Sequence, residues 1–251
     1  MPEAPPGDPM RAAQAAMRPT PLRRFYRVAS VGEAKGGFAL LLDGRGALTP
    51  GKRRLVAPSR AVAELIAAEW AAQKETIDPA SMPTTRLANS AIDAVAAALA
   101  ETEADIAGYA ASDLLCYRAA SPAALVAKEA AAFDPLLDWA AEALGARLLV
   151  ATGVVHVAQP EAALKAIAGA LAAYRAPFAL AALSLIASLS GSAVIALAVA
   201  RGRLAAQEAW RIAHVAEDFE IAQWGEDEEA TRRRQARWRD FAAAAKTLAA
   251  L

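Results

Sequence analysis

The sequence changes character at residues 69–86, which read EWAAQKETIDPASMPTTR. A helix that begins near Ser59 precedes this segment, with side chains at helical spacing as far as Gln73. Pro79 and Pro83 then favour an extended path, because a proline biases the residue before it away from the α-helical region. The segment has no histidine, no cysteine and no glycine-rich loop. It therefore predicts a rigid corner that serves recognition or scaffolding rather than catalysis.

Upstream of this segment, residues 24–57 predict a small antiparallel sheet. Short apolar runs alternate there with the steps Asp43-Gly44 and Pro50-Gly51, which are typical of hairpin turns. Neither turn has the strand-loop-helix context of a phosphate-binding loop. We expect the helix over 59–73 to pack on this sheet.

From residue 84 onward, helical patterns dominate. The expected helices are 84–98, 101–117, 122–144, 160–174, 177–190, 192–201, 205–224 and 228–248, with an extended piece over 148–157. The predicted fold class is α+β, in which a small N-terminal antiparallel sheet with a packed helix is followed by a larger all-helical domain. We divide the chain into a disordered arm (1–22), a small α+β domain (23–100) and an all-helical domain (101–251).

Composition limits the class of protein. Lys and Arg balance Asp and Glu at 27 each, so no long-range attraction to nucleic acid or to an anionic membrane is expected. The single cysteine, Cys116, excludes an intramolecular disulfide and fits a reducing compartment. Residues 178–200 carry no charge and are long enough to span a bilayer, but the SLSGS cluster at 188–192 favours two buried helices. We expect a soluble monomer without stable membrane insertion.

Few residues carry chemistry. His214 lies three and four residues before Glu217 and Asp218, and an imidazole beside carboxylates can bind metal or transfer protons. A metal site needs further ligands, and the other histidine, His156, lies in a separate apolar segment, so we favour a hydrogen bond on the helix surface. The apolar neighbours of Cys116 favour an inert buried thiol. We predict no catalytic residue, no metal and no cofactor.

The charged run at residues 226–239 predicts a solvated helix. Four acids at its start and five arginines further on suit the helix dipole and the i,i+4 pairing rule. A nucleic-acid surface would need a basic surplus and more stacking aromatics. We therefore predict no nucleic-acid partner.

The five tryptophans all lie in helical patterns, where the ring is more often part of a core than of an interface. Trp224 differs, because Gly225 ends its helix and leaves the ring near a rim. Interface hot spots favour aromatic side chains. Trp224 is therefore our candidate anchor for a partner.

Several sequence blocks occur in order between residues 24 and 226. Besides 69–86, they are RFY at 24–26 with LDGR at 42–45 and LTP at 48–50, LAN at 87–89 with ID at 92–93, YAASDLLCYR at 109–118, DPLLDW at 134–139, AEDF at 216–219 and QWG at 223–225. Together they resemble the ATP synthase assembly chaperones that act on the α subunit of the soluble catalytic head, the "ATP-twelve" family. Two residues depart from the family pattern: Phe133 replaces a tryptophan, and Glu220 replaces a glutamine and adds charge.

The resemblance implies an assembly chaperone that binds the ATP synthase α subunit, masks its β-facing surface and prevents aggregation until the head is assembled. It places the family's functionally important acid at Glu217. Helical spacing puts Glu220 and Trp224 on the same side, and Asp218 joins them as a candidate partner-binding residue. The alternatives for Glu217 are an exposed acid on a solvated helix or a buried acid paired with an arginine such as Arg118.

The alternative function is an enzyme that uses the carboxylates Glu217, Asp218 and Glu220. A closed polar cleft would favour that enzyme, whereas a groove or a flat patch would favour the chaperone. The sequence has no ATP-binding loop, which agrees with a chaperone that acts by binding alone. We expect the bacterial cytoplasm, or the mitochondrial matrix if the source is eukaryotic.

Overall fold

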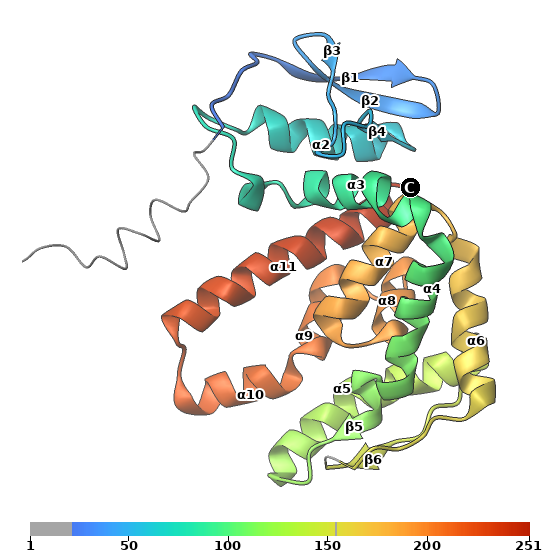
Figure 1. The fold of residues 1–251 in the computed structure, drawn as a ribbon. Helices are drawn as coiled ribbons and strands as arrows, with labels where there is room; N and C mark the ends of the chain where they lie inside the picture. The colour runs from blue at the N-terminus through green and yellow to red at the C-terminus, as the bar shows by residue number, and fades with distance from the viewer. Residues whose placement is uncertain (1–21, 154) are drawn as a thin grey trace, which may run out of the picture.

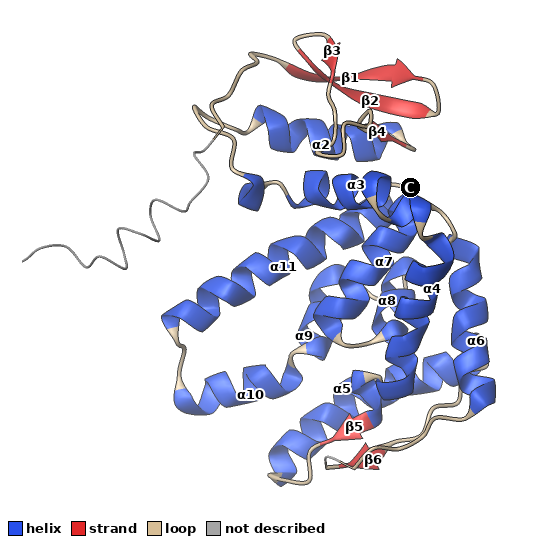
Figure 2. Cartoon of the chain, in the orientation of Figure 1, coloured by secondary structure: helices blue, strands red, loops and turns tan. Residues whose placement is uncertain are grey.

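The structure is a computed structural model and describes residues 22–153 and 155–251. The arm predicted at residues 1–22 lies outside the described residues except for Leu22. In the rest of the chain, a small sheet lies at one end of the molecule, and helices form most of the remainder together with a second, two-stranded sheet (Figures 1 and 2). The predicted α+β class is confirmed.

The N-terminal sheet is antiparallel, as predicted. Its strands are β1 (Ala29–Ala34), β2 (Gly37–Leu42), β3 (Arg45–Gly46) and β4 (Val56–Ala57). Strand β2 pairs with each of the other three strands. The chain enters β2 at Gly37, whose φ is 149° and where a Cβ atom would overlap the carbonyl oxygen of Ala57. Only glycine fits this position without strain.

Helix α2 (Arg60–Ala71) covers one face of the sheet (Figure 1). It buries Val62, Ala63, Ile66 and Ala67, a spacing that gives a helix one apolar face. Ser59 caps the helix, because its Oγ accepts a hydrogen bond from the Val62 amide at 3.1 Å. The same hydroxyl donates to the carbonyl of Ala250 at 2.6 Å, which joins the sheet-bearing part to the last helix.

The 69–86 segment forms the corner between α2 and α3 (Pro83–Asp93). The carboxylate of Glu69 accepts hydrogen bonds from the backbone amides of Thr84 at 2.6 Å and Thr85 at 2.7 Å. It thereby satisfies the first amides of α3 and opposes the positive end of the helix dipole. The Gln73 side chain accepts from the Asp78 amide at 2.8 Å, so the intervening loop is fixed as well.

The remaining part is mainly helical. Its elements are α4 (Leu99–Gly108), β5 (Tyr117–Arg118), α5 (Ala123–Ala143), β6 (Ala151–Thr152), α6 (Glu161–Leu171), α7 (Pro177–Ser190), α8 (Ala193–Ala200), α9 (Ala206–Ala213), α10 (Val215–Trp224) and α11 (Glu228–Ala249). The extended piece expected over 148–157 contains β6, which pairs in parallel with β5. The helix expected over 205–224 is two helices, because the backbone of His214 leaves the helical region.

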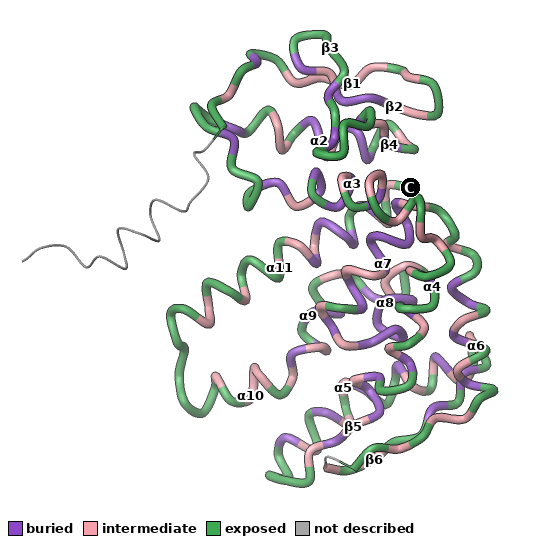
Figure 3. The backbone as a smooth tube through the Cα atoms, in the orientation of Figure 1, coloured by how far each residue is buried: buried purple, intermediate pink, exposed green. Residues whose placement is uncertain are grey.

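Helices α7 and α8 form the centre of the core (Figure 3). The uncharged run 178–200 is interrupted at Gly191, which has a φ of 70° and ends α7. The buried carboxylate of Asp113 then caps α8 by accepting from the amide of Val194 at 3.2 Å. Within the described part of the chain, no helix combines the length and apolarity that crossing a membrane requires.

Candidate functional site

The helical pair α10–α11 is the least buried part of the helical region. Helix α10 buries none of its residues, and α11 buries residues only from Phe241 onward. Figure 3 shows this pair as a largely exposed arm beside the buried centre. A helix with no buried residue gains little stability from packing, so it is a candidate surface for a partner.

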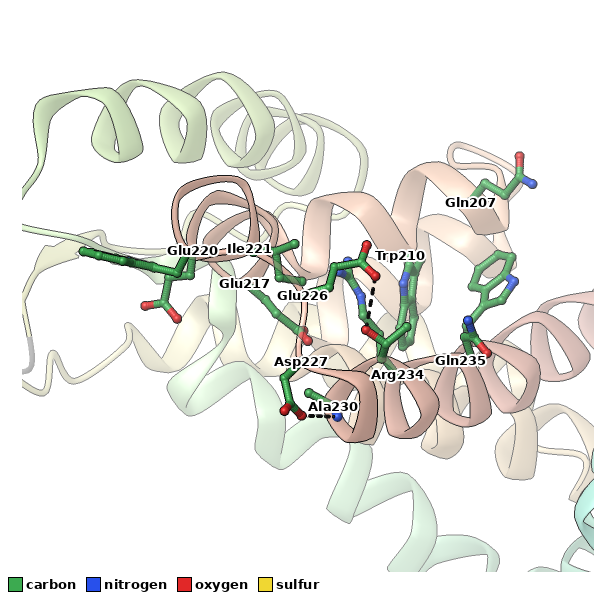
Figure 4. Close-up of a pocket in the computed structure, with 14 residues that line it drawn as sticks. Gln207, Trp210, Glu217, Glu220, Ile221, Glu226, Asp227, Ala230, Arg234 and Gln235 are labelled. Carbon is green, nitrogen blue, oxygen red and sulfur yellow. Dashed lines mark hydrogen bonds between the residues drawn. The ribbon is translucent and has the colours of Figure 1, made fainter.

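A groove of about 570 Å³ lies between α10 and α11, and we call it the Trp224 groove. Its lining residues are Gln207, Trp210, Glu217, Glu220, Ile221, Trp224, Gly225, Glu226, Asp227, Ala230, Thr231, Arg234, Gln235 and Trp238. Figure 4 shows these side chains: Gln207 and Trp210 come from α9, Glu217 and Glu220 from α10, and Arg234 and Gln235 from α11. The helix break at His214 allows α10 to lie opposite α11 rather than to continue α9.

Aromatic rings form the inner wall of the Trp224 groove. The ring of Trp210 lies 5.6 Å from that of Trp238 and 5.5 Å from that of Phe241, measured between centroids. Phe241 is fully buried, and Trp210 is nearly so. The cluster therefore anchors the inner end of the groove in the core, while Trp224 at the other end is 85% exposed.

Carboxylates dominate the polar lining. Glu217, Glu220, Glu226 and Asp227 line the groove, against one lining cation, Arg234. One oxygen of the Asp227 carboxylate is already engaged within the chain, because Oδ1 accepts a hydrogen bond from the Ala230 amide at 2.8 Å and caps α11. The Trp224 groove thus joins an apolar wall to a negative rim.

The predicted partner residues separate into two groups. Glu217, Glu220 and Trp224 line the Trp224 groove together, as their helical spacing indicated. Figure 4 shows the two glutamates on α10. Asp218 does not line it and forms an ion pair with Arg234, which joins α10 to α11. The three carboxylates of the enzyme alternative therefore do not converge on one point.

Glu217 is a half-exposed acid rather than a buried one. Its side chain is 39% exposed. Arg118, the arginine considered as its partner, instead pairs with Asp134 at 2.7 Å and lies over the Phe133 ring at 4.8 Å. The buried-pair interpretation with Arg118 was therefore wrong, and Phe133 keeps an aromatic packing role in the interior.

His214 lies below Glu217 and has a structural role. Its Nδ1 lies 2.7 Å from the carbonyl of Trp210, so this nitrogen carries the proton and donates. Burial lowers the pKa of His214, which keeps the ring neutral near pH 7. Its Nε2 is 3.9 Å from the Glu217 carboxylate, too far for a strong contact. Among the residues that the structure describes, no group of three or more potential ligands could hold a metal ion.

Trp210, Trp238 and Arg234 are among the lining residues that were not predicted from the sequence. The helical pattern of the sequence indicated that Trp210 and Trp238 are core residues. The charged run indicated that Arg234 belongs to a solvated helix. They reach the groove only through the packing of α9 against α11, which no local pattern encodes. The neighbouring arginines follow the prediction, since Arg232 and Arg233 pair with Glu228 and Glu229 along α11.

The Cys116 thiol is not reactive. The side chain is fully buried, and burial raises its pKa to about 12. The thiol therefore stays protonated at neutral pH, and the prediction of a buried cysteine is confirmed.

Comparisons with known proteins define the family. A family model described as ATP12 chaperone protein matches residues 23–141. The crystal structure of Atp12 from Paracoccus denitrificans superposes with a TM-score of 0.84 at 40% identity, over 91% of this chain and 97% of that one. A mutant of the same P. denitrificans protein gives a TM-score of 0.83 at the same identity and coverage.

A protein of Agrobacterium tumefaciens, Atu1473, is also similar. It is described as a presumed chaperone and matches with a TM-score of 0.89 at 48% identity, over 97% of this chain and 91% of that one. The chain belongs to the ATP12 chaperone family. This membership supports the role of an assembly chaperone, which acts on a protein partner.

Proposed function

We propose that this protein binds the α subunit of ATP synthase through the Trp224 groove and masks the β-facing surface of that subunit until the head is assembled. The α subunit follows from the family resemblance. The observation that supports the groove is the exposure of Trp224, whose side chain is 85% accessible on a helix with no buried residue. Exposing a large aromatic ring to water is unfavourable in free energy, and a partner that covers the ring removes this cost.

The shape of the Trp224 groove suits a reversible cap. An apolar wall with a polar rim is the usual anatomy of an interface between separately stable proteins. Binding alone protects the client, because a ligand that binds one state stabilises it by mass action without nucleotide hydrolysis. The β subunit can then replace the chaperone if it binds the same surface more tightly.

The charge of the groove predicts the chemistry of the client segment. Glu217 and Glu220 are unpaired with any cation within hydrogen-bond distance among the described residues. A client segment with arginine or lysine beside apolar side chains would match both the rim and the wall. Glu220, the departure from the family pattern, then strengthens the negative rim.

We expect the protein to act as a monomer without a cofactor. We place it in the bacterial cytoplasm, or in the mitochondrial matrix if the source is eukaryotic. Its partner is a protein, and neither a nucleic acid nor a membrane has a role in the proposal.

The experiment compares two charge reversals with the parent. Glu217→Lys lies in the groove, whereas Glu229→Lys changes net charge equally on the exposed face of α11 outside the lining. We expect Glu217→Lys to weaken binding of recombinant α subunit at least tenfold, about 1.4 kcal/mol, with an unchanged melting temperature.

The control variant should bind within about twofold of the parent, a difference under about 0.5 kcal/mol. Parent protein that fails to bind α subunit, or that binds β subunit equally well, contradicts the proposed partner. Binding that survives Glu217→Lys unchanged removes Glu217 from the docking surface.

A further inference from the structure

A second groove lies on the sheet-bearing part, at the opposite end of the molecule from α10 (Figure 1). It has a volume of about 480 Å³, and we call it the Phe25 groove. Its lining residues are Phe25, Tyr26, Leu42, Asp43, Arg45, Gly46, Ala47, Leu48 and Trp70. Three of the segments that carry the family resemblance, 24–26, 42–45 and 48–50, meet here.

Two large apolar side chains at this groove face solvent. Phe25 is 64% exposed and Leu48 is 57% exposed. The neighbouring Tyr26 is buried, with its hydroxyl donating to the carbonyl of Trp70 at 2.6 Å. The floor of the groove is therefore held in place by the core. The rim presents apolar side chains that folding leaves exposed to solvent.

The two charged residues that line the Phe25 groove, Asp43 and Arg45, differ in their partners. The Asp43 carboxylate turns back onto the chain, where it accepts from the amides of Arg27 at 3.0 Å and Val28 at 2.8 Å. These bonds lower the pKa of Asp43. Arg24 donates only to backbone carbonyls, and Arg45 has no carboxylate partner within the described ranges.

The sequence around the Phe25 groove has a positive net charge. Residues 22–60 contain nine arginines and lysines against two acids, although the whole chain is neutral. Residues 207–238, which span the lining of the Trp224 groove, contain eight acids against five arginines. The two ends of the molecule therefore carry opposite charge, and each attracts a different kind of segment.

We propose that the Phe25 groove is a second docking surface, which binds an acidic segment of a protein partner with apolar side chains at intervals. The apolar side chains would cover Phe25 and Leu48, and the carboxylates would pair with Arg45. A protein segment fits better than nucleic acid, because stacking of successive bases needs a row of exposed aromatic rings and this groove exposes only Phe25 at its rim.

The test uses the full chain, labelled with nitrogen-15, and two ten-residue probe peptides. One probe alternates leucine with glutamate, and the other alternates leucine with lysine. We expect the glutamate probe to shift the amide signals of Gly46 and Ala47 and to bind at least tenfold more tightly than the lysine probe. We expect the double substitution Phe25→Ser and Arg45→Glu to weaken binding of the glutamate probe at least tenfold.

The matched control combines Val28→Ser with Lys35→Glu. Val28 is exposed to a similar degree as Phe25, and Lys35 is an exposed cation in the turn between β1 and β2, but neither residue lines the groove. The control should bind the glutamate probe like the parent. Equal binding of the two probes, or equal loss in the control, overturns the proposal.

Other occupants would give different results, each of which also overturns it. Tighter binding of a single-stranded oligonucleotide than of the glutamate probe would assign the surface to nucleic acid. Shifts at Gly46 and Ala47 that depend on protein concentration would assign it to a second copy of this chain. A probe that binds only after removal of residues 1–21 would assign it to the chain's own N-terminal segment.

Discussion

The 69–86 corner and the Trp224 groove use the same kinds of residue in opposite ways. Both contain a glutamate and a tryptophan on a helix, but in the corner the Glu69 carboxylate is bonded to Thr84 and Thr85 within the chain. In the groove, the Glu217 side chain is half-exposed and Trp224 is 85% exposed. A polar group that the fold satisfies stabilises the fold, whereas one left open is available to a partner.

The most distinctive stretch of the sequence is therefore not the candidate site. The corner looked informative because prolines interrupt a helix that carries a glutamate, a tryptophan and a glutamine. The structure shows its polar side chains bonded within the corner: Gln73 donates to Ser81 and accepts from the Asp78 amide, and Asp78 accepts from the Ala80 amide. The polar exception is the Trp70 indole nitrogen, which is buried without a hydrogen-bond acceptor in the described part of the chain. The comparison predicts that variants at the two places affect different measurements.

The largest effect is expected at the corner. Glu69→Ala removes three hydrogen bonds to the start of α3, two of them from backbone amides that would remain buried. We expect the free energy of unfolding to fall by about 3 kcal/mol, because charged capping bonds are lost and their donors stay unsatisfied. Urea unfolding measures this. Glu64→Ala, at an exposed position of α2, is the control and should change stability by less than about 0.5 kcal/mol.

The buried carboxyl of Asp113 should have the next largest effect. Burial raises its pKa to about 6 in the folded protein, above its usual value of 3.8. The folded state therefore binds the proton more tightly, so stability from this group is present below pH 4 and is lost as the pH rises through 6. Two pKa units correspond to at most about 3 kcal/mol.

The measurement is the free energy of unfolding at pH 4.5 and pH 7. Asp113→Asn cannot ionise, so its stability should fall less than that of the parent between these values. Equal slopes in the two proteins would show that Asp113 does not titrate in this range.

A smaller effect on stability is expected in the groove. Trp224→Ala removes a side chain that is 85% exposed, so unfolding should change by less than about 0.5 kcal/mol. Binding of α subunit should nevertheless weaken by about 2 kcal/mol or more, as for a hot-spot aromatic. Isothermal titration and thermal melting separate the two effects. A variant that is clearly less stable than the parent but binds α subunit normally when folded would show that Trp224 stabilises the fold, as the corner residues do, and does not contribute to binding.

The fold could be predicted where local rules decide it. Hairpin steps indicated the N-terminal sheet, and Gly191 between two serines indicated the break in the apolar run. The break at His214 could not be predicted, because no glycine or proline marks it. At the break, the His214 ring lies against Trp210, four residues earlier, with centroids 3.8 Å apart, and its Nδ1 donates to the Trp210 carbonyl. The pairing of β5 with β6, by contrast, is set by contacts distant in sequence.

The candidate site was predictable only on one helix. Spacing placed Glu217, Glu220 and Trp224 on one side of α10, and they line one groove. The opposite wall comes from α9 and α11, so Trp210 and Trp238 enter it through tertiary structure alone. Asp218 was grouped with the site by its neighbours in sequence, but it turns towards Arg234.

Hydrogen exchange of the complex with recombinant α subunit tests the central claim most directly, namely that the client docks at the open groove and not at the corner. The account predicts added protection in residues 215–230 on complex formation, with exchange in residues 69–86 unchanged. Added protection in residues 69–86, together with unchanged exchange in residues 215–230, would contradict it.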